Sequence, residues 1–342
     1  MVLRRRLLAK APSGLEGLLV SRPLLEGVVR RHILKIANIA AIQNCVVESL
    51  AVSDDKRRVM GVRTASETIP AEVVVDASGR GSHSPAWLEA NGYAKAAEER
   101  VEVGIGYTTR LFRRSLDHLN GDGAAVIPPT PEGKRGGVML AQEGSRWTVT
   151  LIAYLGNYAP VDLAGFIEFA RNLPAPYIYE TIRDAEPIGK PYSARFPASV
   201  RRRYEKLDRF PDGYLVFGDA ICSFNPIYGQ GMSVAALQAA ALEESLATGS
   251  VSARDFFRRA AKVVDSPWSI AVGSDLRIPG TVGPRSRRVD FVNWYIAKLH
   301  KAAHRDPVAS VAFLKVANLV APPPSIMHPK VAMRMLMASF RG

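Results

Sequence analysis

This 342-residue sequence lacks the features that mark several large classes of protein. Its two cysteines, Cys45 and Cys222, are too few for a disulfide framework or a four-ligand zinc site. No apolar run reaches the roughly 18 residues of a membrane-spanning helix, and no apolar stretch of a secretory signal follows the basic N-terminus. Nor do the histidines stand at metal-ligand spacing. These absences predict a cytoplasmic protein without a metal site.

Acidic residues are scarce at both ends of the chain. Residues 1–35 carry a net charge of +6 and residues 254–342 a net charge of +10, which leaves −3 for the middle. Basic ends are compatible with nucleic acid, an anionic membrane or an anionic cofactor, although solvated surface charge is the simplest interpretation. No nucleic-acid-binding motif is present, which argues against that partner. Weak peripheral membrane contact through the basic C-terminal helices is the alternative interpretation for residues 254–342.

The first two thirds of the chain alternate between helical and strand patterns. Apolar residues at helical spacing predict a helix over residues 24–36. Short β-type runs with polar turns then predict an antiparallel meander, which leads to an apolar strand, Val73–Val75, that ends at Asp76. From residue 85 to about 200, alternating runs predict a broad, mostly antiparallel sheet with one helix inserted over residues 162–172.

A different pattern, typical of α/β proteins, returns after residue 200. Tyr214–Phe217 is predicted to form a short buried strand, and a glycine- and proline-rich loop follows over residues 221–231. An alanine-rich helix starts near Met232, with Gly249 as its C-terminal stop. From Ala253 onward the pattern is helical.

The most informative stretch is GDAICSFNPIYGQGM, which begins at Gly218. A buried strand that ends in Gly-Asp places a carboxylate at the C-terminal edge of a sheet, where open α/β folds bind ligands. The loop then passes Pro226, Gly229 and Gly231 into a helix N-terminus, whose free N–H groups favour electron-rich atoms. Asp219 is able to accept hydrogen bonds from sugar-like hydroxyls, and glycines allow a flat ring to approach the backbone.

This stretch resembles the ribityl-binding segment of the flavoprotein monooxygenases related to p-hydroxybenzoate hydroxylase, whose pattern is roughly GDAxxxxxPxxGQGMN. The resemblance implies that Asp219 binds the ribityl chain of FAD and that the helix N-terminus faces the pyrimidine end of the flavin ring. Ser233 stands where asparagine is usual, and Cys222, where many relatives have histidine, is interpreted as packed rather than reactive. Besides Ala220, the matching residues, all predicted to bind the cofactor, are Gly218, Asp219, Pro226, Gly229, Gln230, Gly231 and Met232.

Two further stretches are similar to segments of the same family. Asp76, Gly79 and Arg80 lie in DASGRGS, which resembles the family's D-G-x-x-S segment, where flavin or NAD(P)H is handled. Its order and distance ahead of the Gly-Asp stretch strengthen a match that is weak by itself. The segment SRPLLEGVVRR resembles the arginine-bearing helix of these proteins, which makes Arg22 the candidate contact for the flavin phosphate or ribose.

The resemblance implies a p-hydroxybenzoate-hydroxylase-like α/β fold that binds FAD and NAD(P)H. FAD-binding segments are expected at residues 1–84 and 200–252, a mostly antiparallel substrate sheet at 85–199, and a C-terminal helical region at 253–342. Relatives open with a strand–GxGxxG–helix unit that holds the FAD diphosphate, but no GxGxxG occurs in this sequence. The expected fold therefore lacks its first βαβ, roughly 100 residues with its connection.

Three explanations of that absence are open: a start codon assigned too late, a fragmentary gene, or another chain that supplies the missing piece. The first two are favoured, because removing the βαβ unit takes out a central strand and leaves its neighbours with unpaired edges.

The function implied by the resemblance is that of an FAD-dependent monooxygenase. NAD(P)H would reduce FAD, and one oxygen atom of O2 would be transferred to a small hydrophobic organic substrate by hydroxylation or epoxidation. The protein would supply position, electrostatics and exclusion of water, and no catalytic acid or base is identified. One alternative is a flavin-dependent reductase or a halogenase-like relative, although the WxWxIP-type motif of halogenases is absent. The other is a non-catalytic fragment that does not bind FAD.

Overall fold

The computed structural model describes residues 2, 3, 6–247 and 252–340. The chain divides into two compact units, each built from separate stretches of sequence. The sheet unit comprises residues 1–40, 102–197 and 273–342. The α/β unit comprises residues 41–101 and 198–272.

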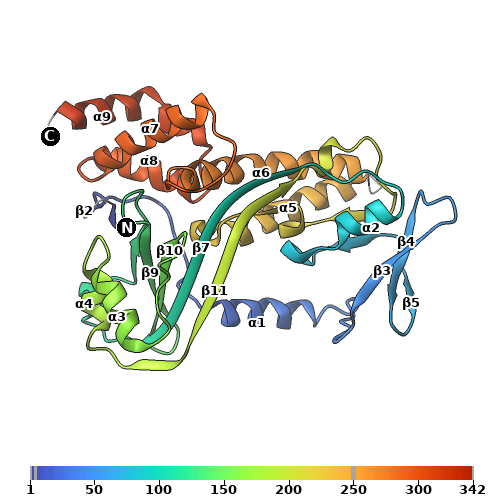
Figure 1. Ribbon diagram of the computed structural model, residues 1–342, viewed down its shortest axis with the longest axis horizontal. Helices are drawn as coiled ribbons and strands as arrows, with labels where there is room; N and C mark the ends of the chain where they lie inside the picture. The colour runs from blue at the N-terminus through green and yellow to red at the C-terminus, as the bar shows by residue number, and fades with distance from the viewer. Residues whose placement is uncertain (1, 4–5, 248–251, 341–342) are drawn as a thin grey trace. The chain divides into compact units, whose positions relative to one another are not determined.

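An antiparallel sheet dominates the sheet unit (Figure 1). β10 (Arg146–Tyr154) pairs along its length with β7 (Glu98–Arg113) on one side and with β9 (Arg135–Gln142) on the other. β9 in turn pairs with β8 (Ala124–Ile127), and β11 (Pro187–Arg202) follows β7 in the strand order. The connections between β8, β9 and β10 are short, as expected for antiparallel neighbours.

Alternation of apolar and polar residues explains why this region forms a sheet with one buried face. Along β10, Trp147, Val149 and Leu151 are fully buried, whereas the residues between them are partly exposed. The mostly antiparallel sheet predicted within residues 85–199 is therefore confirmed. Its largest fully buried core side chains are Phe112, Ile127, Met139, Trp147, Leu151 and Phe166.

Two helices cover this buried face. α3 (Leu163–Arg171) is the helix predicted over residues 162–172, and the side chain of Asp162 caps it by accepting a hydrogen bond from Gly165 N at 2.8 Å. α4 (Tyr177–Ile182) was not predicted from the sequence. It has six residues and no side-chain cap, so little in its local sequence marks it. Packing of Ile178 and Ile182 against the core stabilises it instead.

The remaining elements of the sheet unit come from the two ends of the chain. The N-terminal end forms the short pair β1 (Val2–Leu3) and β2 (Arg6–Leu7) and then α1 (Arg22–Ile33), which agrees with the predicted helix over 24–36. Within residues 273–342 lie α7 (Arg287–Ala303), α8 (Pro307–Ala317), η6 (Pro323–Met327) and α9 (Pro329–Phe340).

The three C-terminal helices pack on one another, as Figure 1 shows. Ser286 and Asp306 begin α7 and α8 with side-chain caps, and prolines separate α8 from α9. The predicted helical pattern is confirmed here. No helix of the described residues is both long and apolar enough to cross a membrane.

The α/β unit contains two small sheets. β3 (Val47–Val52), β4 (Val59–Thr64) and β5 (Thr68–Pro70) form the predicted antiparallel meander. β6 (Val74–Asp76) and β12 (Tyr214–Val216) pair in parallel, and no third strand of the described residues joins them. Both strands lie within one residue of their predicted positions.

The helices of the α/β unit are α2 (Ser84–Ala90), α5 (Gly231–Leu246) and α6 (Ala253–Asp275), whose last three residues belong to the sheet unit. α5 begins one residue before the predicted start at Met232, and the predicted stop at Gly249 lies outside the described residues. α2 was not predicted. The prediction of a helix from Ala253 is confirmed, but α6 continues through Pro267.

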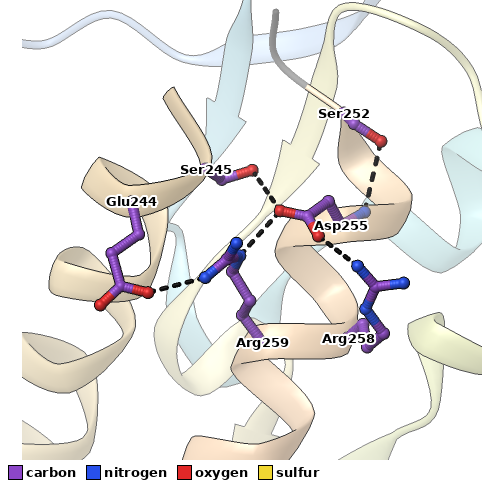
Figure 2. A network of polar contacts seen from close by, with 6 residues as sticks. All are labelled: Glu244, Ser245, Ser252, Asp255, Arg258 and Arg259. Atoms are coloured by element: carbon purple, nitrogen blue, oxygen red, sulfur yellow. Dashed lines mark hydrogen bonds and ion pairs between the residues drawn. The ribbon is translucent and has the colours of Figure 1, made fainter. Parts of the chain in front are cut away.

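A polar network fastens α5 to α6 (Figure 2). The carboxylate of Asp255 accepts hydrogen bonds from Arg259 Nε at 2.7 Å, Arg258 Nη2 at 2.5 Å and Ser245 Oγ at 3.2 Å. Arg259 also pairs with Glu244 at 2.7 Å. Hydrogen bonding from Arg259 lowers the pKa of Asp255, so the carboxylate remains charged at neutral pH.

The compact units and the predicted domains divide the chain differently. Residues 1–40 belong to the sheet unit, although residues 1–84 were predicted to be part of the FAD-binding domain. Compact units are defined by contacts, whereas the predicted domains are defined by role, so the predicted roles remain hypotheses.

Candidate functional site

Parallel pairing of β6 and β12 brings the two motifs of the sequence to one edge of a sheet. Val74 pairs with Tyr214, and Asp76 pairs with Val216. Both strands therefore end on the same side, and each is followed by a short 3-10 turn, η1 (Gly79–Gly81) or η4 (Gly218–Ala220). The two turns contact each other. The C-terminal edge of parallel strands is where α/β folds place ligands.

Hydrogen bonds from three directions hold the Gly-Asp turn. Phe217 N donates to Asp76 O at 2.9 Å, which continues the parallel ladder into the turn. Gly218 N donates to the buried Oε1 of Gln238 on α5, also at 2.9 Å. Arg202 Nη1 donates to Ala220 O at 2.9 Å. The backbone of the turn is thereby fixed.

The side chain of Asp219 is exposed, in contrast to the buried residues on either side of it. It lies toward the start of α5, because a Cβ built on Gly231 would stand 4.0 Å from Asp219 Oδ1. The first turn of α5 contains no acidic side chain, and Gln230 provides no side-chain cap there. A carboxylate and a helix N-terminus are therefore neighbours at this edge.

The loop between them is shaped by local hydrogen bonds. Asn225 Oδ1 accepts from Ile227 N at 3.2 Å and begins the short helix η5 (Pro226–Tyr228). Gly229 then turns the chain with φ of 67°, a left-handed conformation that favours glycine. Of the predicted cofactor residues on this loop, Pro226 and Gly229 are exposed, Gln230 is buried, and Met232 is 50% exposed.

Asp76 has a very different environment, although it also follows a parallel strand. Its carboxylate accepts hydrogen bonds from Ser78 N at 2.9 Å and from the hydroxyls of Ser78, Ser82 and Ser84. Ser84 Oγ also lies 2.6 Å from Tyr214 OH. Because the single hydroxyl proton of Ser84 is donated to Asp76, Tyr214 OH donates to Ser84 Oγ. Two carboxylate oxygens offer about four acceptor positions, so these donors fill Asp76.

The hydroxyl network also changes the protonation of Asp76. Burial by itself would raise the pKa of Asp76, but the hydrogen bonds from Ser78, Ser82 and Ser84 outweigh burial and hold the pKa below its ordinary value. Asp76 is 8% exposed and stays ionised at neutral pH. Asp76 therefore fastens the DASGRGS turn in place. Sequence reasoning predicted Asp76 as a direct cofactor contact, and that role stays a prediction.

Glycine backbone at this edge is open toward its surroundings. A Cβ added at Gly79, Gly81, Gly218 or Gly229 would meet no atom within 4 Å. In contrast, a Cβ at Gly213, at the other end of β12, would lie 2.5 Å from a backbone oxygen. The first four glycines are therefore not required by close packing within the unit. Their open sides fit the approach of a flat ring system, which a side chain would obstruct.

The exposed Arg80 lies in η1, between the two open glycines Gly79 and Gly81. Arg22 belongs to the sheet unit, where it begins α1 and pairs with Glu26 at 3.4 Å. The α/β unit thus assembles all the predicted cofactor residues except Arg22.

Two cavities lie away from the predicted cofactor residues. One of about 510 Å³ and one of about 310 Å³ both lie in the sheet unit, and neither is lined by a predicted cofactor residue. A flavin-sized cavity around Asp219 remains a prediction.

Several supporting residues of the site were not predicted. Arg202, Tyr214 and Gln238 hold the two turns through side-chain hydrogen bonds. Gln238 had a signal in the sequence, because it lies seven residues after Gly231 in a helix of mostly apolar residues.

Cys222 is 1% exposed and burial raises the pKa of its thiol, which confirms the prediction of a packed cysteine. No metal-binding cluster occurs among the described residues.

Comparison with known proteins places this geometry in a class. No family model matches the sequence. The flavin-dependent brominase Bmp2 is similar with a TM-score of 0.57 and 14% identity, over 94% of this chain and 75% of that one. PqsL of Pseudomonas aeruginosa, a probable FAD-dependent monooxygenase, is similar with a TM-score of 0.53 and 16% identity, over 75% of this chain and 71% of that one. The chain therefore has the p-hydroxybenzoate-hydroxylase-like fold of flavin-dependent monooxygenases and halogenases.

One curated protein matches at the level of sequence. Protein Rv3254 of Mycobacterium tuberculosis is 33% identical over 316 residues, which are 88% of this chain. The chain spans 66% of the length of that relative, just under two thirds.

Proposed function

We propose that this chain carries the ring- and ribityl-binding part of an FAD site and serves an FAD-dependent oxidoreductase. The observation that carries the proposal is the edge formed by β6 and β12, where the exposed carboxylate of Asp219, the start of α5 and four open glycines lie together. A carboxylate suits the hydroxyls of a ribityl chain, and free N–H groups suit the electron-rich edge of a flavin. The fold shared with flavin-dependent enzymes supports the same conclusion.

Different residues at the C-terminal edge of β6 and β12 would contact different parts of FAD. Asp219 would accept hydrogen bonds from ribityl hydroxyls. The N–H groups of Met232 and Ser233, in the first turn of α5, would donate to the pyrimidine edge of the ring. Asp76 would keep the neighbouring turn, with Arg80, in position. When bound, FAD would supply the redox chemistry, and the protein would orient it and exclude water.

The finer proposal is a monooxygenase that uses NAD(P)H and O2 to oxidise a small hydrophobic substrate. A cavity of about 510 Å³ in the sheet unit suits a largely hydrophobic substrate with a polar group. Its lining combines the apolar Leu18, Leu19, Val20 and Leu24 with the polar Arg114, Gln142 and Glu143. Volumes of about 300–1,000 Å³ are typical of small-molecule sites. The likeness to a brominase keeps a halogenase-like activity as the second candidate, against the missing WxWxIP-type motif.

The proposal that the chain holds only the ring and ribityl part of FAD, called the half-site proposal below, predicts which flavins the chain binds. Diphosphate binding usually relies on the glycine-rich unit, and these 342 residues contain no GxGxxG. Purified protein should therefore bind riboflavin, FMN and FAD with similar, weak affinities. Flavin fluorescence and equilibrium dialysis measure all three. Tight, stoichiometric binding of FAD alone would show that the chain holds the diphosphate as well, and the half-site proposal would be wrong.

A substitution tests the role of Asp219 directly. Asp219→Ala should weaken binding of each flavin about tenfold, as expected when hydrogen bonds worth about 1.4 kcal/mol are lost. Asp212→Ala is the matched control, because Asp212 is also exposed but precedes β12 at its opposite end. Binding to the control should stay within about twofold of wild type. Equal affinities of the Asp219 variant and wild type would remove Asp219 from the site.

A further inference from the structure

α7 carries an exposed stripe that its packing does not explain. Arg287, Phe291, Trp294, Lys298 and Lys301 recur at intervals of four and three residues, which places them on one face of the helix. Lys298 is partly exposed and the other four are exposed. The two aromatic residues of this stripe are more than half exposed, Phe291 at 54% and Trp294 at 55%, with ring centroids 5.9 Å apart. This stripe is called the α7 stripe below.

The α7 stripe is separate from the face that anchors the helix. Tyr295, Leu299, Ala302 and Ala303 are buried, and Tyr295 OH donates to the backbone oxygen of Ile326 at 2.7 Å. Phe291 lies about 60° or more around the helix from the centre of the buried residues. The helix is held without the stripe.

The C-terminal part of the chain that contains the α7 stripe is strongly basic. Residues 277–342 contain eleven Lys and Arg, two Asp and no Glu, a net charge of +9. One of the two acids, Asp306, is already used, since it caps α8 and lies 3.6 Å from Arg334. The adjacent helix α9 also exposes large apolar side chains: Met333 at 53%, Leu336 at 55% and Met337 at 48%.

We propose that α7 and α9 form a docking surface for an anionic phospholipid membrane. The cations of the α7 stripe match the negative charge of the headgroups, and Phe291 and Trp294 match the apolar layer just beneath them. Aromatic, aliphatic and basic side chains on one exposed helix surface are typical of helices that lie in the membrane interface. The contact is made at the surface and leaves the fold of the sheet unit unchanged.

Co-sedimentation of the full chain with vesicles tests the proposal. The protein should sediment with vesicles of phosphatidylcholine containing about one third phosphatidylglycerol, and release from them when salt is raised to about 0.5 M. It should not sediment with pure phosphatidylcholine. Arg287→Gln/Lys298→Gln/Lys301→Gln should lower partitioning on the order of a hundredfold, because three cations are lost from the stripe.

A charge-matched control separates the α7 stripe from net charge. Lys56→Gln/Lys206→Gln/Lys262→Gln removes three exposed cations of the α/β unit and should lower partitioning far less. Trp294 gives an independent signal, because Trp147 and Trp268 are buried and Trp87 is partly buried. Anionic vesicles should shift tryptophan emission to the blue in wild type but not in Trp294→Phe.

Two outcomes would overturn the proposal. Equal losses of partitioning in the stripe variant and the control would make the effect one of net charge alone. Absence of sedimentation with anionic vesicles at low salt would leave a protein partner as the occupant of this surface.

Discussion

Asp76 and Asp219 follow neighbouring parallel strands, yet their carboxylates have opposite environments. Asp76 is 8% exposed and receives hydrogen bonds from one backbone N–H and three hydroxyls. Asp219 is exposed, and its two neighbours in the turn, Gly218 and Ala220, are held through their backbone by Gln238 and Arg202. One carboxylate is buried among donors of its own unit, and the other lies at the surface of the site.

The comparison shows that position in a motif does not define a role. Both residues fit a family pattern that associates them with the flavin. The difference comes from the serines at positions 78, 82 and 84, which the chain folds back onto Asp76. Burying a charged carboxylate without such donors would destabilise the folded chain. The three serines are therefore the reason that Asp76 remains charged there.

The largest expected difference in the free energy of unfolding is between alanine variants of Gly213 and Gly218. Gly213 and Gly218 both have positive φ, of 71° and 64°. Gly213→Ala should lower the free energy of unfolding by about 3–5 kcal/mol, because the new Cβ adds overlap with backbone oxygens to the conformational strain. Gly218→Ala should cost only the strain, about 1–2 kcal/mol. Chemical denaturation of both variants measures the difference, and equal losses would contradict the open environment assigned to Gly218.

Alanine variants of Asp76 and Asp219 should show the next largest difference in the free energy of unfolding. Asp76→Ala should lower the free energy of unfolding by about 3 kcal/mol, because its donors lose their acceptor inside the unit. Asp219→Ala should change it by less than about 0.5 kcal/mol, as is usual for an exposed residue. The same denaturation curves report both values. A large loss of stability in the Asp219 variant would mean that Asp219 is structural too, and its effect on flavin binding would need another explanation.

The stability that Asp76 contributes should also depend on pH, with a smaller effect. The pKa of Asp76 is lower in the folded chain than the value of about 3.9 expected when it is unfolded. Its ionised form therefore adds stability that is fully present above about pH 4 and is lost as the pH falls through the folded-state pKa. The stability gap between wild type and Asp76→Asn should narrow over that acidic range. A gap that does not depend on pH would contradict the lowered pKa.

Much of the fold could be predicted because its signals are local. Alternating side chains predicted the antiparallel sheet, and the helix predicted over residues 162–172 corresponds to α3. α2 and α4 were missed, because helices of seven and six residues hold too few turns for a periodic signal. The end of α6 was not predicted, and the helix continues through Pro267, a residue type that usually bends or ends a helix.

The sequence by itself determined that a carboxylate, two glycines and a helix start lie close together after one strand, because all of them fall within Gly218–Met232. It could not determine that Ser84 and Tyr214 meet, or that Gln238 holds Gly218, because these contacts join residues far apart in the chain or on facing elements. Nor could it place Phe291, because apolar spacing marks a helix face without showing which part another helix covers. Those outcomes were decided by the tertiary structure, since burial and hydrogen-bond partners depend on what packs against each residue.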